Sequence, residues 1–172
     1  VFKALDNLND TGVGVFILPN SILTSDVDAE YRKYLVDNDL LDVVVAIPNK
    51  FFINTDIPTT VLKINKNKPK HRKGKVTLIK SKPTGLFKRN QKGEDHMKTR
   101  VYTKTFLTFN DEDLLEIGEA IKKQTYEPEF SKTVDNEEIK ENGYIIAPNR
   151  YIGMKPMEDN SRSFKDIIND IK

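Results

Sequence analysis

The 172-residue sequence predicts an α/β fold with a mixed sheet, on three observations. Two short apolar runs, residues 13–18 (VGVFIL) and 40–47 (LLDVVVAI), are rich in β-branched side chains, and each is followed by a proline. A helical pattern at residues 25–36 lies between them. Strand, helix and strand with short joints form a βαβ unit, in which the two strands run parallel and the crossover is right-handed.

The residues of this unit predict its burial. Both apolar runs are almost continuous, so we expect each strand to be buried on both faces. The helix begins at Ser25, whose hydroxyl can cap it, and acidic residues fill its first turn. Tyr31, Tyr34 and Leu35 have i, i+3, i+4 spacing, which predicts that they form the inner face of the helix.

The middle of the chain alternates between strands and polar connections. Residues 61–64 and 76–79 are predicted strands, and residues 101–109 alternate enough to form another. Residues 81–100 show no sustained period and include a proline and two glycines, so we expect a loop there. This region, residues 81–109, is predicted to be a basic insertion of loop and strand.

The C-terminal part is predicted to be mostly helical. Asn110, with Asp113 three residues on, is a helix cap signal. The buried face of this helix is expected to hold Leu114, Leu115, Ile117 and Ile121. A short helix is expected at residues 137–141, within a helical segment 110–152, and the apolar spacing near the end predicts a tail helix within residues 153–172.

Composition excludes several classes of protein. The chain has no cysteine, which removes disulfides, thiol nucleophiles and zinc–thiolate sites. No apolar run approaches the roughly 18 residues of a membrane helix, so we expect a cytoplasmic protein with no membrane partner. His71 and His96 stand apart within basic stretches, and we therefore expect no metal site.

Charge is distributed unevenly along the chain. The net charge is only +2, but residues 63–104 hold 15 Lys and Arg against 2 acidic residues, between two mildly acidic flanks. One contiguous cationic block of this kind favours a polyanionic partner such as nucleic acid. The alternative is a solvated hairpin whose charges bind nothing.

Three stretches carry a family resemblance. They are Leu-Pro-Asn at residues 18–20, Arg-Lys-x-Leu at residues 32–35, and Leu-Leu through to Pro at residues 40–48. Adenine-specific DNA methyltransferases have the same motifs in the same order, on a strand, a helix and a second strand. The chain most closely resembles the modification (M) subunit of type I restriction-modification systems.

The resemblance extends over most of residues 10–152. Phe52, Thr55, Ile57 and Pro58 match the family pattern of Phe, then Thr three residues later, then Ile-Pro. The further similar stretches are residues 60–66 (TVLKINK), 72–79 (RKGKVTLI), 110–121 and 130–152.

The resemblance implies the later half of a Rossmann-like methyltransferase sheet within residues 1–80: the fifth strand, its helix, the sixth strand and an antiparallel seventh strand beside it. The family's glycine-rich loop for S-adenosylmethionine and its Asn-Pro-Pro-aromatic motif are both absent. The resemblance therefore implies the C-terminal portion of such an enzyme, with no catalytic and no cofactor-binding residue in this chain. Alone it is expected to be inactive and to need the N-terminal part.

Family members flip an adenine out of the duplex and transfer a methyl group from S-adenosylmethionine to its exocyclic amine. The resemblance places Phe52, Thr55 and Pro58 in the wall of the pocket for that base. Phe52 would stack on the base, and Thr55 would support the loop or contact the backbone. The alternative is that Phe51 and Phe52 cap the hydrophobic end of the sheet.

The cationic block is expected to contact phosphates of double-stranded DNA near the flipped base. The candidate residues are Lys66, Lys68, Lys70, Arg72, Lys73, Lys75, Lys80, Lys82, Lys88, Arg89, Lys92, Lys98 and Arg100. The resemblance further implies a specificity subunit and a restriction subunit as partners. Two other interpretations remain: a noncatalytic DNA-binding or assembly module, and a scaffold whose tail helix docks on a specificity subunit.

Overall fold

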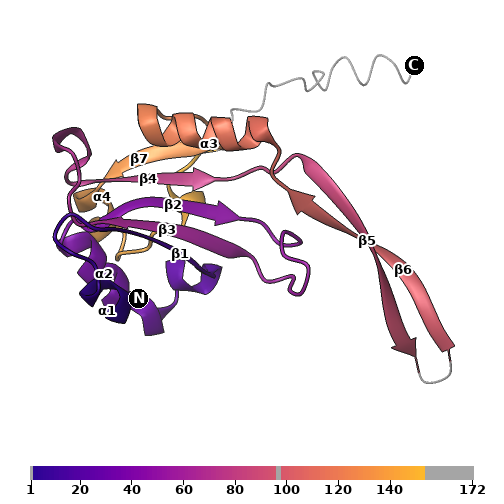
Figure 1. Ribbon diagram of the computed structural model, residues 1–172. Coiled ribbons are helices and arrows are strands. Elements are labelled where there is room, and N and C mark those ends of the chain that lie inside the picture. Colours follow the sequence, from indigo (N-terminus) through magenta and orange to yellow (C-terminus); the bar gives the residue numbers. More distant parts are fainter. Residues whose placement is uncertain (1, 96–97, 154–172) are drawn as a thin grey trace, which may run out of the picture.

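A five-stranded mixed sheet forms the centre of the protein in the computed structural model, which describes residues 2–95 and 98–153 (Figure 1). Its strand order is β1-β3-β2-β4-β7. The strands are β1 (Val13–Pro19), β2 (Leu41–Ile47), β3 (Thr59–Asn65), β4 (Lys75–Lys80) and β7 (Ser131–Asp135). The predicted α/β class and the strands predicted at residues 40–47, 61–64 and 76–79 are confirmed.

Strand β3 lies antiparallel between β1 and β2. Val15 of β1 pairs with Lys63, and Val45 of β2 pairs with Val61. Strands β1 and β2 therefore run parallel to each other with β3 inserted between them, as the resemblance implied. On its other side β2 pairs parallel with β4, and β7 closes that edge in antiparallel register.

Helices cover the sheet on both faces. The helices are α1 (Phe2–Asp6), α2 (Ala29–Asp37), α3 (Asp111–Lys123) and α4 (Asn136–Glu141), with 3-10 turns η1 (Asn20–Leu23), η2 (Asp26–Asp28), η3 (Lys70–Arg72) and η4 (Pro148–Arg150). Figure 1 shows α3 on one face and α1, α2 and α4 on the other. The larger core joins Leu35 of α2 and Ile139 of α4 to the sheet, and the smaller core joins Ala120 of α3 to it.

The predicted burial of β1 on both faces is wrong. Strand β1 is an edge strand, and its side chains alternate between exposed and half-buried. Val15 and Ile17 are 62% and 61% exposed, whereas Phe16 and Leu18 pack against the larger core. An apolar run specifies that a strand can be buried, but its depth depends on which neighbours the sheet supplies.

Helix α2 buries the predicted face only in part, since Leu35 is buried and Tyr31 is half-buried. Tyr34 is exposed, and the buried side chains are those of Arg32, Leu35 and Val36. The Arg32 guanidinium donates to the carbonyls of Tyr144, Ile22 and Ser25 at 2.8, 3.0 and 2.7 Å. A buried arginine that satisfies three loop carbonyls is favourable, because each of those oxygens would otherwise lose its hydrogen bond to water.

The region 81–109 is also more regular than the sequence predicts. Strands β5 (Gly85–Asp95) and β6 (Lys98–Thr108) form a two-stranded hairpin where a loop was expected over residues 85–95.

In α3, the cap at Asn110 is confirmed, but Leu114 and Leu115 are exposed, and Ile117, Ala120 and Ile121 face the sheet.

The mostly helical segment predicted at residues 110–152 is not confirmed as a whole, because it contains strand β7 beside α3 and α4. This strand is largely polar (SKTVD) and has no alternating pattern, so only its place beside β4 reveals it. The short helix predicted at residues 137–141 is confirmed as α4. The tail helix predicted near the C-terminus lies outside the described residues.

A buried ion cluster ties β2 to β3, to η3 and to α3. The Asp42 carboxylate has no exposed surface and accepts from Arg72 Nε at 2.6 Å, with Lys63 Nζ 2.9 Å away. Arg72 also donates to the carbonyl of Ile121 at 2.6 Å. Burial alone would raise the pKa of Asp42, but its bonds to Lys63 and Arg72 outweigh burial and lower that pKa below its usual value.

Substitution of Asp42 should destabilise the chain strongly. Asp42→Asn leaves the buried Arg72 without its counter-charge, and we expect a loss of about 3 kcal/mol in the free energy of unfolding, measured by urea titration. Because the folded pKa of Asp42 is lowered, its contribution is present above the unfolded pKa and is lost as pH falls through the folded value. Exposed Asp10→Asn is the control. Equal midpoints for both variants would contradict this role.

Candidate nucleic-acid interface

Two chain excursions leave the sheet side by side. The loop of residues 48–58, here called the pocket loop, follows β2, and the hairpin follows β4. Strands β2 and β4 are parallel neighbours, with Ala46 opposite Lys80, so both excursions begin at the same edge. Ser81 joins the two exits, because its backbone N–H and its hydroxyl both donate to the Ala46 carbonyl at 3.1 and 2.7 Å. In α/β sheets, ligands bind at this carboxyl edge.

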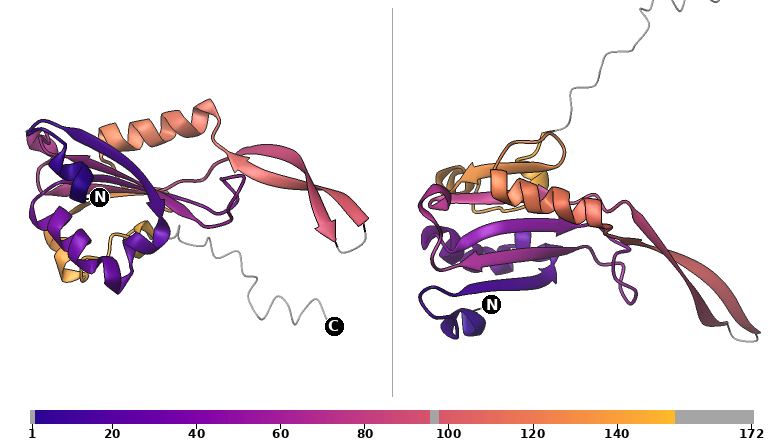
Figure 2. Two further views of the ribbon diagram at one scale, coloured as in Figure 1. Left: turned by 60° about the horizontal axis from the view of Figure 1, so that its bottom comes forward. Right: turned by 45° about the horizontal axis from the view of Figure 1, so that its top comes forward.

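The hairpin of β5 and β6, here called the arm, projects beyond the sheet. Its register runs without a shift from Gly85 opposite Thr108 to Asp95 opposite Lys98. Figure 2 shows it extending from the body in both views. Strands of 11 residues reach about 35 Å at the usual rise per residue.

The root of the arm is fastened to helix α3. The Asp113 carboxylate accepts from the backbone N–H and the hydroxyl of Thr84 at 3.0 and 2.9 Å, and from the backbone N–H of Asn110 at 3.0 Å. The bond from the Thr84 backbone is the main reason that the pKa of Asp113 lies below its usual value. The side chain that closes the capping box therefore also fixes the first residue before the arm.

The pocket loop packs against the C-terminal end of the arm's second strand, at the root of the arm. The ring of Phe51 lies 4.8 Å from that of Phe109 and meets Phe52 edge-on at 5.3 Å. The Leu107 N–H donates to the Lys50 carbonyl at 2.8 Å. Phe52, the predicted base-stacking residue, is half-buried.

The other predicted pocket residues shape the loop. The Thr55 hydroxyl accepts from the Ile57 N–H at 3.1 Å, which stabilises the turn, and Thr55 is half-buried. Pro58 is exposed, and its carbonyl accepts from the backbone N–H of Asn20 at 3.0 Å. The three residues therefore share one short loop, which ends beside the start of η1.

Basic residues of the second half of the block lie on the same side as the pocket loop. This set, here called the arm cluster, is Lys80, Lys82, Lys88, Arg89, Lys92, Lys98 and Arg100. The first four are exposed. The other three lie in β5 and β6, but their side chains lie outside the described residues.

The first half of the block lies at the opposite end of the sheet. The chain between β3 and β4 joins the ends of those strands that are remote from the pocket loop, about 20 Å away along β4. Lys70, Lys73 and Lys75 are exposed there, and we call them the distal cluster. Lys66 is half-buried and donates to the Leu8 carbonyl at 2.6 Å.

Lys68 and Arg72 are removed from the predicted phosphate contacts. Their side chains are only 1% and 8% exposed, and Arg72 belongs to the Asp42 cluster. Lys68 Nζ lies 2.6 Å from the Asp39 carboxylate and donates to the Lys75 carbonyl at 2.9 Å. Burial lowers the pKa of Lys68 despite the opposing effect of Asp39. Both side chains are therefore structural, and the prediction that they contact DNA is corrected.

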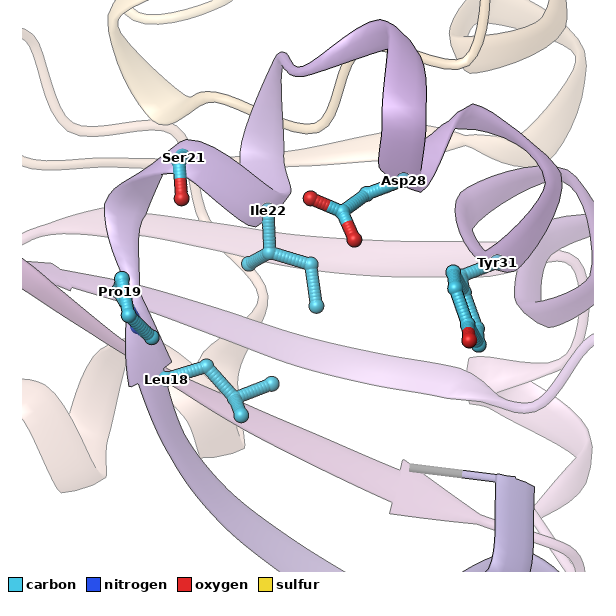
Figure 3. Close-up of a pocket in the computed structure, with 6 residues that line it drawn as sticks. All are labelled: Leu18, Pro19, Ser21, Ile22, Asp28 and Tyr31. Carbon is cyan, nitrogen blue, oxygen red and sulfur yellow. The ribbon is translucent and has the colours of Figure 1, made fainter.

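Two hollows lie near the C-terminal end of β1. The larger, of about 350 Å³, opens between the end of β1 and helix α2 (Figure 3). It is lined by Leu18, Pro19, Ser21, Ile22, Asp28 and Tyr31. The smaller, of about 170 Å³, lies at the carboxyl edge between Asn20, Lys80 and Asn149.

Within the described residues there is no group of three or more His, Cys, Asp or Glu side chains that could hold a metal ion. The same part of the chain contains no helix of the length and apolar character needed to cross a membrane.

A sequence model of the family described as N-6 DNA methylase matches residues 1–160. The chain belongs to this family. The resemblance drawn from the motifs at residues 18–20, 32–35 and 40–48 is confirmed at this level.

Relatives in the family include methylase subunits of type I restriction enzymes. The MjaIX methylase subunit of Methanocaldococcus jannaschii is 35% identical over 156 residues, which cover 86% of this chain and 26% of that protein. The HindI methylase subunit of Haemophilus influenzae is 30% identical over 173 residues, or 96% of this chain and 35% of that protein. The chain thus spans about a quarter to a third of these relatives.

A solved structure has the same fold. The type I restriction-modification methyltransferase subunit from Streptococcus thermophilus superposes with a TM-score of 0.65 at 26% identity, over 84% of this chain and 27% of that one. The five-stranded mixed sheet therefore matches the structure of that methyltransferase subunit.

Sequence reasoning missed two residues that join the pocket loop to the arm. Asp56 of the loop and Lys104 of β6 form an ion pair with Nζ and a carboxylate oxygen 2.9 Å apart. Lys104 lies at the end of the basic block, but the signal that singles it out is the hairpin register. That register places it opposite Arg89, and its Nζ lies 5.4 Å from the centre of the Phe106 ring.

Proposed function

We propose that this chain is the DNA-contacting part of the modification subunit of a type I restriction-modification system. That subunit would transfer a methyl group from S-adenosylmethionine to the exocyclic amine of a flipped adenine. Family membership supports the reaction class. The observation that carries the assignment of this part is the meeting of the pocket loop and the basic arm at the carboxyl edge of the sheet.

Phe52 is the residue that we propose to stack on the flipped base. Its ring is held edge-on by Phe51, which in turn packs on Phe109, so it is presented on a braced loop. A rigid aromatic face stabilises an unstacked base without requiring a particular hydrogen bond. Thr55 would keep the loop in shape through its bond to Ile57, and Pro58 would form the outer wall.

The arm cluster would bind DNA phosphates beside that pocket. Lys82, Lys88 and Arg89 are exposed and leave the same edge as the pocket loop. Phosphate contacts position a protein on DNA without selecting a sequence, which suits a system whose specificity subunit selects the site. A restriction subunit would be the further partner. The distal cluster faces the other end of the sheet and would remain solvated.

Charge reversal distinguishes the two clusters. We expect Lys88→Glu with Arg89→Glu to weaken binding to a short duplex at least tenfold and to reduce the slope of log affinity against log salt by about 2, as loss of two phosphate contacts would. The matched pair Lys70→Glu with Lys73→Glu should leave affinity within about threefold. Fluorescence anisotropy over a salt series measures both. Equal losses for the two pairs, or none for either, would contradict the assignment.

The remainder of the subunit would supply the cofactor loop and the catalytic motif. In that arrangement β1, β2 and β3 are the fifth, sixth and seventh strands of the methyltransferase sheet. The free edge of β1 would pair with a preceding strand, and exposed Val15 and Ile17 would be covered. The support is this open apolar edge together with the greater length of the relatives.

Ile17→Glu tests that pairing. We expect it to lower the thermal midpoint of the complete subunit by several degrees, since a buried carboxylate is costly, and to change that of the 172-residue chain by less than about 2 °C. Val27→Glu is the control, because Val27 is 87% exposed and lies outside the strand. A small effect of Ile17→Glu in the complete subunit would refute the pairing.

A further inference from the structure

We propose that Lys104 is a positioning residue: through its ion pair with Asp56, the arm holds the pocket loop in its working position. This inference rests on the proposed function, since the loop matters because it would receive the base. The loop follows β2, whereas DNA would bind on the arm, so some contact must keep the loop in place relative to the arm.

The described contacts of the pocket loop are mostly with the arm's second strand and the residues after it. The carboxylate of Asp56 meets Lys104 Nζ at 2.9 Å, and the Lys50 carbonyl accepts from Leu107 N–H at 2.8 Å. One ring contact, at 4.8 Å, follows between Phe51 and Phe109. These contacts involve positions 104, 107 and 109 of one strand and its extension, so they fix the loop's position along the arm.

The charges around Lys104 explain why an acidic residue faces it. Lys104 lies directly opposite Arg89 in the hairpin, and like charges at a cross-strand pair repel. The ammonium group also lies 5.4 Å from the centre of the buried Phe106 ring, which restricts where it can go. Asp56, on the loop, supplies the opposite charge.

The ion pair between Lys104 and Asp56 links phosphate binding on the arm to the pocket loop. Arg89 is exposed and belongs to the arm cluster, whereas Lys104 is only 30% exposed and already paired. A phosphate that binds Arg89 reduces the repulsion on Lys104 and leaves its bond to Asp56 intact. DNA on the arm should therefore fix the arm and, through Lys104, the loop that carries Phe52.

A probe on the loop can report this link, because the chain has no native cysteine. Asn54→Cys places a single nitroxide label on an exposed loop position. Its rotational mobility is measured by electron paramagnetic resonance, with and without a short duplex, in the full 172-residue chain. Circular dichroism and the thermal midpoint check that each variant is folded.

Without DNA, we expect Lys104→Gln and Asp56→Asn each to shorten the rotational correlation time of the label at least twofold. The charge swap Lys104→Asp with Asp56→Lys should restore it. Lys33→Gln removes a charge at an exposed position of α2, outside both clusters, and is the matched control, with no expected change. If neither single variant loosens the label, or the swap fails to restore it, the positioning role is overturned.

With DNA, the label should slow in the parent chain and slow by less than half as much in Lys104→Gln, while duplex affinity stays within about threefold. Equal slowing in both would overturn the link between arm and loop. Failure of the parent chain to bind duplex would instead count against the proposed function. The DNA-free comparison would then still decide the role of Lys104.

Discussion

The parallel pairing of β2 with β4 determines how the candidate interface is built. Strand β2 is buried along almost its whole length, so it stays at the centre of the sheet, and a parallel neighbour must end at the same edge. The chain therefore leaves both strands at one place. Ser81 bonds to Ala46 across the two exits, and the pocket loop and the arm then grow from a common root.

The same topology divides the basic residues by their position in the fold. The connection between β3 and β4 lies at the end of the sheet remote from the pocket loop, and two of its basic side chains are buried and form ion pairs. Arg72 compensates the buried carboxylate of Asp42, and Lys68 pairs with Asp39. A buried carboxylate without such partners would be costly, so these cations stabilise the fold and are not available to a ligand. A run of charge that is continuous in sequence is thus three separate features in space.

The sequence was sufficient to predict the elements whose pattern is local. The buried run of β2, the cap at Asn110 and the family motifs led to the α/β class, helix α3 and the inserted strand β3. The sequence did not predict burial or strand formation where these depend on residues distant in the chain. The burial of β1 depends on a partner strand, and the polar strand β7 is recognisable only from its pairing with β4. The strands of the arm are stabilised by pairing with each other. The contacts of Asp56 with Lys104 and of Phe51 with Phe109 cannot be predicted until that pairing is known.

Three single-tryptophan variants test the proposal that the pocket loop and the arm face DNA together while the distal cluster does not. The chain lacks tryptophan, so Phe52→Trp, Phe87→Trp and His71→Trp each give a single tryptophan, on the loop, the arm and the distal end, which is excited selectively over the tyrosines. The probe is a short duplex with an adenine opposite an abasic site, where extrusion of the base costs least. Quenching at positions 52 and 87 with no change at 71 is the predicted result. Quenching at position 71 alone, or equally at all three, would show that the loop and the arm do not face DNA together.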